Sequence, residues 1–189
     1  PTGTPYRLCT FSRVCKEKGI EDAVRAVASV NEALGYTAYT LDIYGQVDSG
    51  QTEWFEQLMK TVPCEVQYKG SVAYDQSVAV IKNYFALLFP TQYYTEGIPG
   101  TIIDAYAAGV PVISSKWESF SDVIHEGITG VGYSFGALNE LVEVLIRLVD
   151  NPETMIEKKI PCLRLAQEYT PSAAITILTE RIRNVENKR

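Results

Sequence analysis

The sequence predicts an α/β protein in which one parallel sheet of about six strands is covered by helices on both faces. Strand-like and helix-like segments alternate along the chain, and glycine or proline separates most of them. The strand-like segments are largely apolar. A strand that is apolar on both faces is buried on both faces, which is typical of parallel sheets. The predicted architecture is therefore Rossmann-like.

The first half of the chain contains three strand-like and three helix-like segments. The strands are expected at residues 7–12, 39–45 and 65–70. The first helix is expected at about residues 19–34, because five small or branched apolar residues recur there at helical spacing before Gly35: Ile20, Ala23, Val24, Val27 and Val30. Further helices are expected at residues 51–60 and from Asp75, its expected cap, to about residue 83.

The second half continues the alternation and ends in helices. Strands are expected at residues 86–90, 111–115 and near 130–133, and the first of these, ALLFP, is apolar throughout and is predicted to be central. Thr170 followed by Pro171 is typical of a helix start. The helices are expected at residues 101–108, 121–125, 138–150, 153–168 and 171–187.

Composition and charge narrow the classes of function. The chain has 189 residues, which suits one domain, and its net charge of −6 argues against nucleic-acid binding and against contact with an anionic membrane through this chain. No apolar stretch is long enough to span a bilayer. The chain has four cysteines: Cys9, Cys15, Cys64 and Cys162. They form no C-x-x-C pair, so they are expected to be free thiols, which favours a reducing compartment.

These properties predict a cytoplasmic protein, with the whole enzyme at most peripheral at the inner face of the membrane. Because the chain begins at Pro1 and not at a methionine, we expect it to be part of a longer protein.

Several common catalytic motifs do not occur in the sequence. Neither G-x-x-x-x-G-K-[ST] nor G-x-G-x-x-G is found, and no D-x-D is found, so neither a common phosphate loop nor an aspartate-held metal is expected. His125 is the only histidine, which excludes a histidine-based triad or metal cluster built from this chain alone. We therefore predict no metal ligands and no cofactor.

Two groups of residues favour an anion site at the carboxyl edge of the sheet, where parallel sheets bind ligands. Arg13 follows the first strand and Lys18 directly precedes the first helix, so two cations are available to a diphosphate. The helix after GIPG offers the backbone N–H groups of Gly100, Thr101 and Ile102 to an anion. Solvated surface charges and an ordinary glycine–proline turn are the structural alternatives.

Two carboxylates flank the same turn. Glu96 precedes GIPG, and Asp104 lies about one turn into the following helix, on the side that points back toward the strand ends. Asp104 is placed to accept hydrogen bonds from the hydroxyls of a ribose, and Glu96 from those of a second sugar across a diphosphate. Alternatively, Asp104 is a favourable charge near a helix start and Glu96 is a solvated loop residue.

Taken together, these segments resemble the carboxy-terminal half of GT-B glycosyltransferases of the large retaining group called family 4. SRVCKEKG (residues 12–19) is similar to the family's GR-x-x-x-x-KG segment. EGIPGTIIDAYAAGVPV (residues 96–112) is similar to its EGFP…E-A-x-A-A-G-x-PV segment, with the usual E-x7-E present as Glu96-x7-Asp104. IYGQ, YKGSV and EGITG are weaker matches in the right order, so the resemblance covers nearly the whole chain.

The resemblance implies that residues 1–189 form the nucleotide-sugar-binding C-terminal domain, and that an N-terminal acceptor domain is absent from this chain. It implies a hexosyltransferase that moves a sugar from a UDP or GDP sugar to a sugar or lipid-linked acceptor with retention and without metal, as in polysaccharide biosynthesis. The nucleotide sugar is then the donor substrate, and the isolated domain is expected to be inactive.

The resemblance also implies a role for each matching residue. Arg13 and Lys18 hold the diphosphate, Glu96 binds the donor sugar and Asp104 binds the ribose. The remaining residues line the base pocket or donate backbone N–H groups to the phosphates: Lys69, Ser71, Val72, Gly100, Thr101 and Ile102.

The chain departs from the family pattern at three places. Asp104 stands where glutamate is usual, Ser12 replaces a glycine, and WESFS (residues 117–121) replaces a glycine-containing loop. Two other classes of function therefore stay open at this point. One is a non-catalytic nucleotide-binding module on the same fold, and the other is an unrelated flavodoxin-like domain whose carboxylates are only helix caps.

Overall fold

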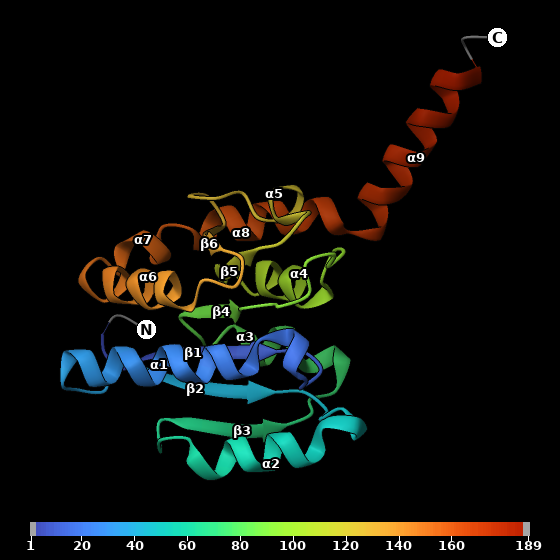
Figure 1. Cartoon of the computed structure of the whole chain (residues 1–189). Helices are drawn as coiled ribbons and strands as arrows, with labels where there is room; N and C mark the ends of the chain where they lie inside the picture. The colour runs from blue at the N-terminus through green and yellow to red at the C-terminus, as the bar shows by residue number, and fades with distance from the viewer. Residues whose placement is uncertain (1–2, 187–189) are drawn as a thin grey trace.

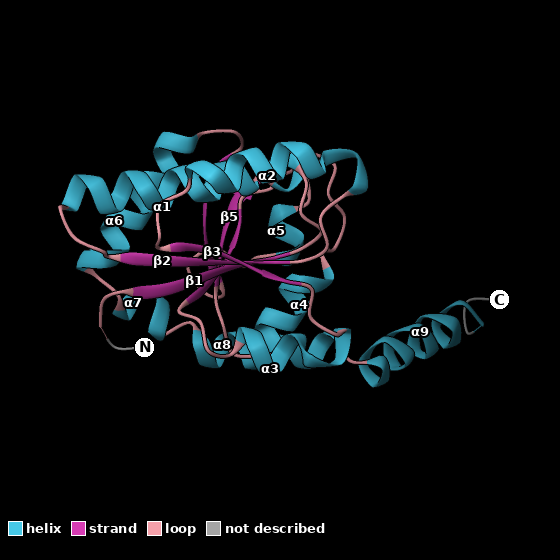
Figure 2. Cartoon of the chain, turned by 90° about the horizontal axis from the view of Figure 1, so that it is seen from below, coloured by secondary structure: helices cyan, strands magenta, loops and turns pink. Residues whose placement is uncertain are grey.

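The computed structural model describes residues 3–186, which form one six-stranded sheet with helices packed on both of its faces (Figures 1 and 2). All strand pairs are parallel, and the strand order is β3-β2-β1-β4-β5-β6. The predicted fold class is confirmed. The strands are β1 Tyr6–Phe11, β2 Tyr39–Tyr44, β3 Val66–Gly70, β4 Ala86–Phe89, β5 Val112–Lys116 and β6 Gly130–Ser134.

The helices form two layers around the sheet (Figure 2). One layer contains α1 (Ile20–Leu34), α2 (Thr52–Thr61) and α6 (Leu138–Asp150). The other contains α3 (Ser77–Ile81), α4 (Gly100–Ala107) and α8 (Lys159–Ala166). The remaining short helices are α5 (Phe120–Val123) and α7 (Glu153–Ile156).

The core is split into two clusters by the sheet. Leu88 belongs to the cluster under α1 and α6, whereas its neighbour Leu87 belongs to the cluster under α4 and α8. Successive side chains of a strand point to opposite faces, so this division places β4 in the interior of the sheet. The apolar ALLFP segment is therefore central, as predicted.

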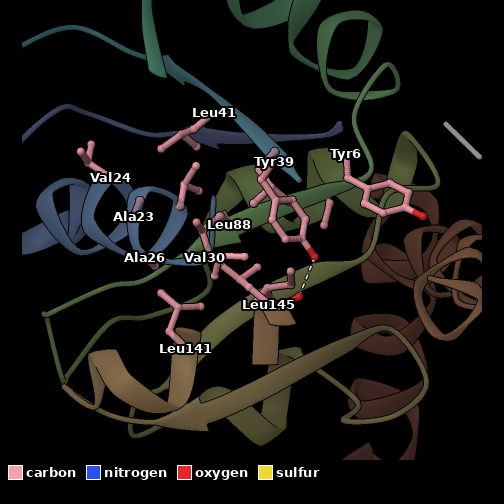
Figure 3. Packing of buried hydrophobic residues seen from close by; sticks show 14 of the residues in the cluster. Tyr6, Ala23, Val24, Ala26, Val30, Tyr39, Leu41, Leu88, Leu141 and Leu145 are labelled. Carbon is pink, nitrogen blue, oxygen red and sulfur yellow. Dashed lines mark hydrogen bonds between the residues drawn. The ribbon is translucent and has the colours of Figure 1, made fainter. Parts of the chain in front are cut away.

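A buried hydrogen bond joins β2 to α6 inside the first cluster. The Tyr39 hydroxyl donates to the Leu145 carbonyl oxygen at 2.9 Å (Figure 3). We expect Tyr39→Phe to lower the free energy of unfolding by about 1 kcal/mol, because the bond is lost in a dry environment. Chemical denaturation measures this, and Tyr36→Phe is the control, since Tyr36 is 49% exposed. Equal stability of the two variants would contradict the assignment.

The predicted helices agree with the structure except in two segments. The single helix expected at residues 153–168 is wrong: α7 and α8 are separate, and a 3-10 turn, Gln167–Tyr169, follows α8. Pro161 explains the break, because a proline has no N–H for the helix ladder and its ring collides with the carbonyl four residues earlier, at Glu157. Asp75 does not cap a helix, since it lies within the 3-10 turn Tyr74–Gln76.

The last helix, α9 (Pro171–Glu186), extends away from the sheet (Figure 1). The Thr170 hydroxyl accepts a hydrogen bond from the Ala173 N–H at 3.3 Å, as a cap should. Residue 187, where this helix was expected to end, lies outside the described residues. Ile175, Leu178 and Ile182 are 64%, 61% and 51% exposed on it.

Candidate functional site

Three loops meet at the carboxyl edge of the sheet, following β1, β2 and β4. The first two are joined as a continuation of the sheet, because the Val14 N–H donates to the Gln46 carbonyl at 2.8 Å and the Asp48 N–H donates to the Val14 carbonyl at 3.0 Å. The loop after β4 is joined to the first by a bond from the Gln92 N–H to the Glu17 carbonyl at 2.8 Å. These bonds fix the polar side chains between them.

Two glycines allow the loops to approach so closely. Gly19 has a φ of +68°, and a Cβ there would lie 1.8 Å from the Pro90 carbonyl oxygen. Gly45 has a φ of +136°, and a Cβ there would lie 1.7 Å from the Ser12 carbonyl oxygen. Only glycine fits at either position. Gly19 thereby holds Lys18 next to the end of β4, and Gly45 holds the β2 loop against the β1 loop.

The loops enclose a hollow of about 330 Å³. Arg13, Lys18 and Glu96 all line it, so the structure brings together the three residues predicted to act on the diphosphate and the donor sugar. Five further residues that the sequence analysis did not assign to the site complete the lining: Cys15, Glu17, Asp48, Gln51 and Tyr93.

The Lys18–Glu96 ion pair is the most enclosed polar contact of the hollow. Lys18 Nζ lies 2.5 Å from Glu96 Oε2, and the two side chains are only 18% and 13% exposed. The same carboxylate oxygen accepts a second hydrogen bond, from the buried Thr91 hydroxyl at 3.2 Å. Charge-assisted bonds of this kind are strong where water is scarce, so Glu96 is held in one position.

Arg13 makes a more open contact. Its guanidinium Nη1 lies 3.4 Å from Asp48 Oδ2, with the side chains 66% and 31% exposed. Arg13 and Asp48 also line a second hollow of about 490 Å³ beside the first, together with Gln46, Val47 and Ser49. The pair therefore lies between two adjacent hollows, where water screens it.

The sequence carries only a weak signal for the residues near the hollow that were not predicted as site residues. These residues all follow a strand at its carboxyl end, but polar loop residues are common: Asp48, Gln51, Thr91 and Tyr93.

Gln51 bridges the loops, since its side-chain carbonyl accepts from the Lys16 N–H at 2.7 Å and its amide donates to Glu17 at 2.9 Å. Burial, followed by the contact with Glu17, raises the pKa of the Cys15 thiol above its usual value, which disfavours the thiolate form.

The start of α4 differs in part from expectation. Asp104 is partly buried on α4 and does not line the hollow that holds Arg13, Lys18 and Glu96. The prediction of a free N–H at Ile102 is not met, because this N–H donates to the Pro99 carbonyl at 3.0 Å and closes the first helical turn. Gly100 is exposed at the helix start, and the Thr101 hydroxyl is buried without a hydrogen-bond partner.

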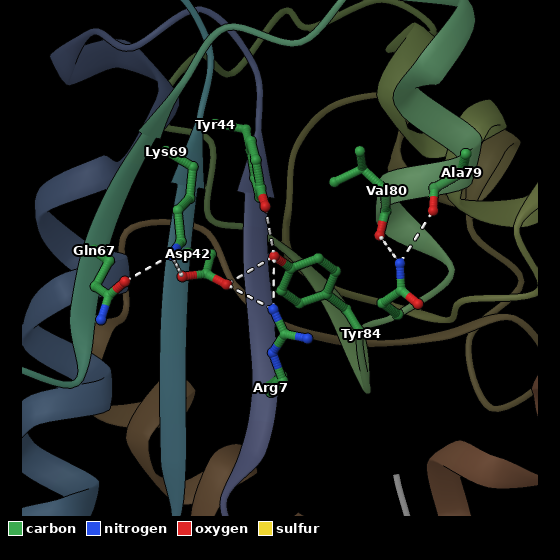
Figure 4. A network of polar contacts seen from close by, with 9 residues as sticks. Arg7, Asp42, Tyr44, Gln67, Lys69, Ala79, Val80 and Tyr84 are labelled. Carbon is green, nitrogen blue, oxygen red and sulfur yellow. Dashed lines mark hydrogen bonds and ion pairs between the residues drawn. The ribbon is translucent and has the colours of Figure 1, made fainter.

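The residues predicted to line a base pocket lie elsewhere on the sheet. Ser71 and Val72 follow β3, an edge strand two positions from β1, and are not among the lining of the hollow. Lys69 projects from β3 over the sheet face, where its Nζ lies 2.6 Å from the Gln67 side-chain oxygen and 3.6 Å from Asp42 Oδ1 (Figure 4).

Asp42 is the centre of this polar network on the sheet face. Its other oxygen accepts from Arg7 at 2.9 Å and from the Tyr84 hydroxyl at 2.7 Å, and Tyr44 contacts Tyr84 at 2.8 Å (Figure 4). Burial, followed by these bonds, raises the pKa of Tyr84 well above its usual value. The network ties β1, β2 and the segment before β4 together, and it occupies the Lys69 side chain. The resemblance implied that residues 69–72 line the base pocket mostly through their backbone, and this stays a prediction.

Fold and site together define a class of protein, an α/β domain with a charged ligand hollow where its strand order reverses, between β1 and β4. The chain belongs to the glycosyl transferases group 1 family, whose pattern matches residues 5–151. One curated relative is the amylovoran biosynthesis glycosyltransferase AmsK of Erwinia amylovora, 24% identical over 154 residues that cover 76% of this chain. The chain spans about a third of the length of its curated relatives, 36% for AmsK.

Solved structures show the same fold. HepE of Anabaena, crystallised with UDP and glucose, superposes with a TM-score of 0.79 at 16% identity, covering 96% of this chain and 48% of that one. The C-terminal domain of a glycosyl transferase group 1 family protein of Francisella tularensis superposes with a TM-score of 0.74 at 15% identity, covering 87% of this chain and 85% of that one. The predicted GT-B architecture is confirmed.

Residues 3–186 lack the features of a metal site and of a membrane-spanning helix. No three histidine, cysteine, aspartate or glutamate side chains in this part of the chain are grouped to hold a metal ion. None of its helices has the length and apolar character needed to cross a bilayer.

Proposed function

We propose that residues 1–189 are the donor-binding C-terminal domain of a retaining, family 4 glycosyltransferase. The observation that carries this proposal is the Lys18–Glu96 pair, together with Arg13, in one hollow at the reversal of strand order. In open α/β sheets ligands bind in that crevice. Cations and a carboxylate side by side match a ligand that combines a diphosphate with a hydroxyl-rich sugar.

The proposed reaction transfers a hexosyl group from a nucleotide-diphosphate sugar without metal. The bond between the anomeric carbon and the diphosphate oxygen breaks, and its electron pair leaves with the nucleoside diphosphate. A bond to the acceptor oxygen forms on the same face, and the proton of the acceptor hydroxyl passes to the departing diphosphate oxygen. Lys18 and Arg13 meet the negative charge that develops on the leaving group, as preorganised cations do, and Lys18 is the less exposed of the two. Glu96 accepts hydrogen bonds from the donor sugar.

The other predicted residues complete the donor site in this proposal. Asp104 binds the ribose hydroxyls, and the exposed start of α4 at Gly100 and Thr101 faces the phosphates. The turn after β3 that contains Ser71 and Val72 borders the base through its backbone, and Lys69 stays in its contact with Asp42. No cofactor is needed, because the nucleotide sugar is itself a substrate.

We further propose that an N-terminal GT-B domain completes the enzyme and binds a sugar or lipid-linked acceptor. The length of the relatives supports this, since they are nearly three times as long as the matched segment. The chain by itself is then expected to bind nucleotide but to transfer no sugar. The proposed place of action is the cytoplasm, with polysaccharide biosynthesis as the setting of AmsK.

Nucleotide titration tests the binding role. A nucleoside diphosphate at 100 times its dissociation constant is expected to stabilise the chain by about 2.7 kcal/mol, measured by thermal unfolding with UDP, GDP and ADP. The matching nucleoside without phosphates is the control and should stabilise it far less. If all three diphosphates leave the melting temperature unchanged, the charged hollow binds no nucleotide in this chain and the proposed donor-binding role is wrong. Addition of EDTA should not alter binding if no metal takes part.

A further inference from the structure

The Lys18–Glu96 pair has a consequence for how the site distinguishes its ligands. In the proposed function, Lys18 binds the diphosphate and Glu96 binds the sugar. In the structure these two groups bind each other, at 2.5 Å and with little exposure to water. Glu96 therefore competes with a phosphate group for the same ammonium group.

Glu96 cannot easily move aside for a phosphate. Its Oε2 is held by the Thr91 hydroxyl at 3.2 Å, and Thr91 is itself fully buried. The Thr91 carbonyl accepts from the Ser115 hydroxyl at 2.7 Å, which fixes this residue to the end of β5. A phosphate that approaches Lys18 therefore has to compete with a fixed carboxylate that already pairs with the ammonium group, in a place where water screens the pair little.

The donor sugar changes the competition between Glu96 and the phosphate for Lys18. Hydroxyl groups of a nucleotide-bound sugar donate hydrogen bonds to Glu96 and replace Lys18 as its partner. A nucleoside diphosphate without its sugar provides no such donors, so it takes Lys18 away and leaves the Glu96 carboxylate unpaired. An unpaired group of this kind is costly where it is largely shielded from water.

We propose that Glu96 acts as an internal competitor that weakens binding of the nucleoside diphosphate product relative to the nucleotide-sugar donor. After transfer, Lys18 returns to the fixed Glu96 carboxylate, which helps to expel the product. This inference rests on the proposed function. Arg13, the second cation, contributes less to this competition, because its pair with Asp48 is longer, at 3.4 Å, and is more exposed to screening water.

The test uses Glu96→Gln, which keeps the shape of the side chain and its ability to accept from Thr91 but removes its charge. Isothermal titration with whichever of UDP, GDP and ADP the native chain binds should show binding about five- to tenfold tighter in the variant. The matched control is Glu53→Gln. Glu53 is exposed in the first turn of α2 and does not line the hollow, so the loss of its charge should change the affinity by less than about twofold.

A Lys18→Met chain shows whether the effect of Glu96→Gln on nucleotide affinity depends on Lys18. In a Lys18→Met chain, the further change Glu96→Gln should no longer tighten nucleoside diphosphate binding, because the cation for which Glu96 competes has been removed. A gain that persists in this background would overturn the proposal, since it would be a general effect of charge.

A nucleotide sugar of the same base gives the third measurement. The native chain should bind it more tightly than the nucleoside diphosphate, and Glu96→Gln should reduce that ratio. If the native chain binds a nucleoside diphosphate but Glu96→Gln binds it equally or less tightly, this inference is wrong while the proposed function stands. If the native chain binds none of the three nucleotides, the proposed function itself fails.

Discussion

Gly19→Ala is expected to destabilise the chain by at least about 3 kcal/mol, the largest effect among the changes considered for stability. The added Cβ would lie 1.8 Å from the Pro90 carbonyl oxygen and 2.7 Å from the carbon that bears it. Both are backbone atoms at the end of the central strand β4, so they cannot move without disturbing the sheet. Thermal unfolding should show a fall of about 6–12 °C in the melting temperature.

Gly35→Ala is the matched control for this prediction. Gly35 has a similar φ of +74° at the end of α1, but a Cβ there has nothing within 4 Å. Only the conformational strain remains, and it should cost about 1 kcal/mol. Equal losses in the two variants would mean that the close approach of Gly19 to Pro90 does not matter, and that only the backbone angle does.

Lys18→Met is expected to weaken nucleoside diphosphate binding by about 10- to 100-fold, the largest effect on binding. Methionine keeps most of the length of the side chain but removes the ammonium group that the proposal assigns to the diphosphate. Loss of the cation also leaves Glu96 unpaired at 13% exposure, so circular dichroism is needed to verify that the variant is folded. Isothermal titration then measures the affinity.

Lys16→Met provides the comparison in the same 3-10 turn, Lys16–Lys18. The Lys16 ammonium lies 5.8 Å from the Trp54 ring centroid and does not line the hollow. Its replacement should change nucleotide affinity by less than about twofold, as an exposed charge outside the site does. If both lysines matter equally, general electrostatic attraction governs binding, and the specific role of Lys18 is refuted.

The position of the hollow explains why residues so far apart in the sequence meet. Lys18 follows β1 and Glu96 follows β4, and the two residues are 78 positions apart in the sequence. These two strands are adjacent because the strand order reverses there, and their following loops leave in opposite directions. Parallel strands bring their carboxyl ends to one edge, so the order of the strands decides which loops meet.

Much of the fold and part of the candidate site could be predicted from the sequence, for identifiable reasons. The central strand β4 is recognisable because its residues are apolar on both faces, whereas the edge strand β3 has exposed polar residues. Helix α1 is recognisable because its apolar residues recur at helical spacing. The grouping of Arg13, Lys18 and Glu96 follows from their places directly after strands. The break at residues 157–158 was missed, although Pro161 signals it, because the apolar pattern continues across it.

Other features could not be predicted, because they depend on contacts between distant segments. Lys69 follows the pattern of a ligand-binding residue, yet its side chain lies over the sheet face beside Asp42, whose position is fixed by β2. Thr91 is an ordinary threonine in the sequence, and only the packing of the β4 loop places its hydroxyl on Glu96. Asp48 joins the hollow because Gly45 lets the β2 loop touch the β1 loop.

The sequence by itself determined the α/β class, the order of the elements and the family. These properties depend on local patterns of apolar residues, glycines and charges, which are written along the chain. The tertiary structure decided which charges are partners. Lys18 binds Glu96 and Arg13 binds Asp48 because strand order and loop packing set the distances, and the strength of an ion pair depends on distance and on exposure to water.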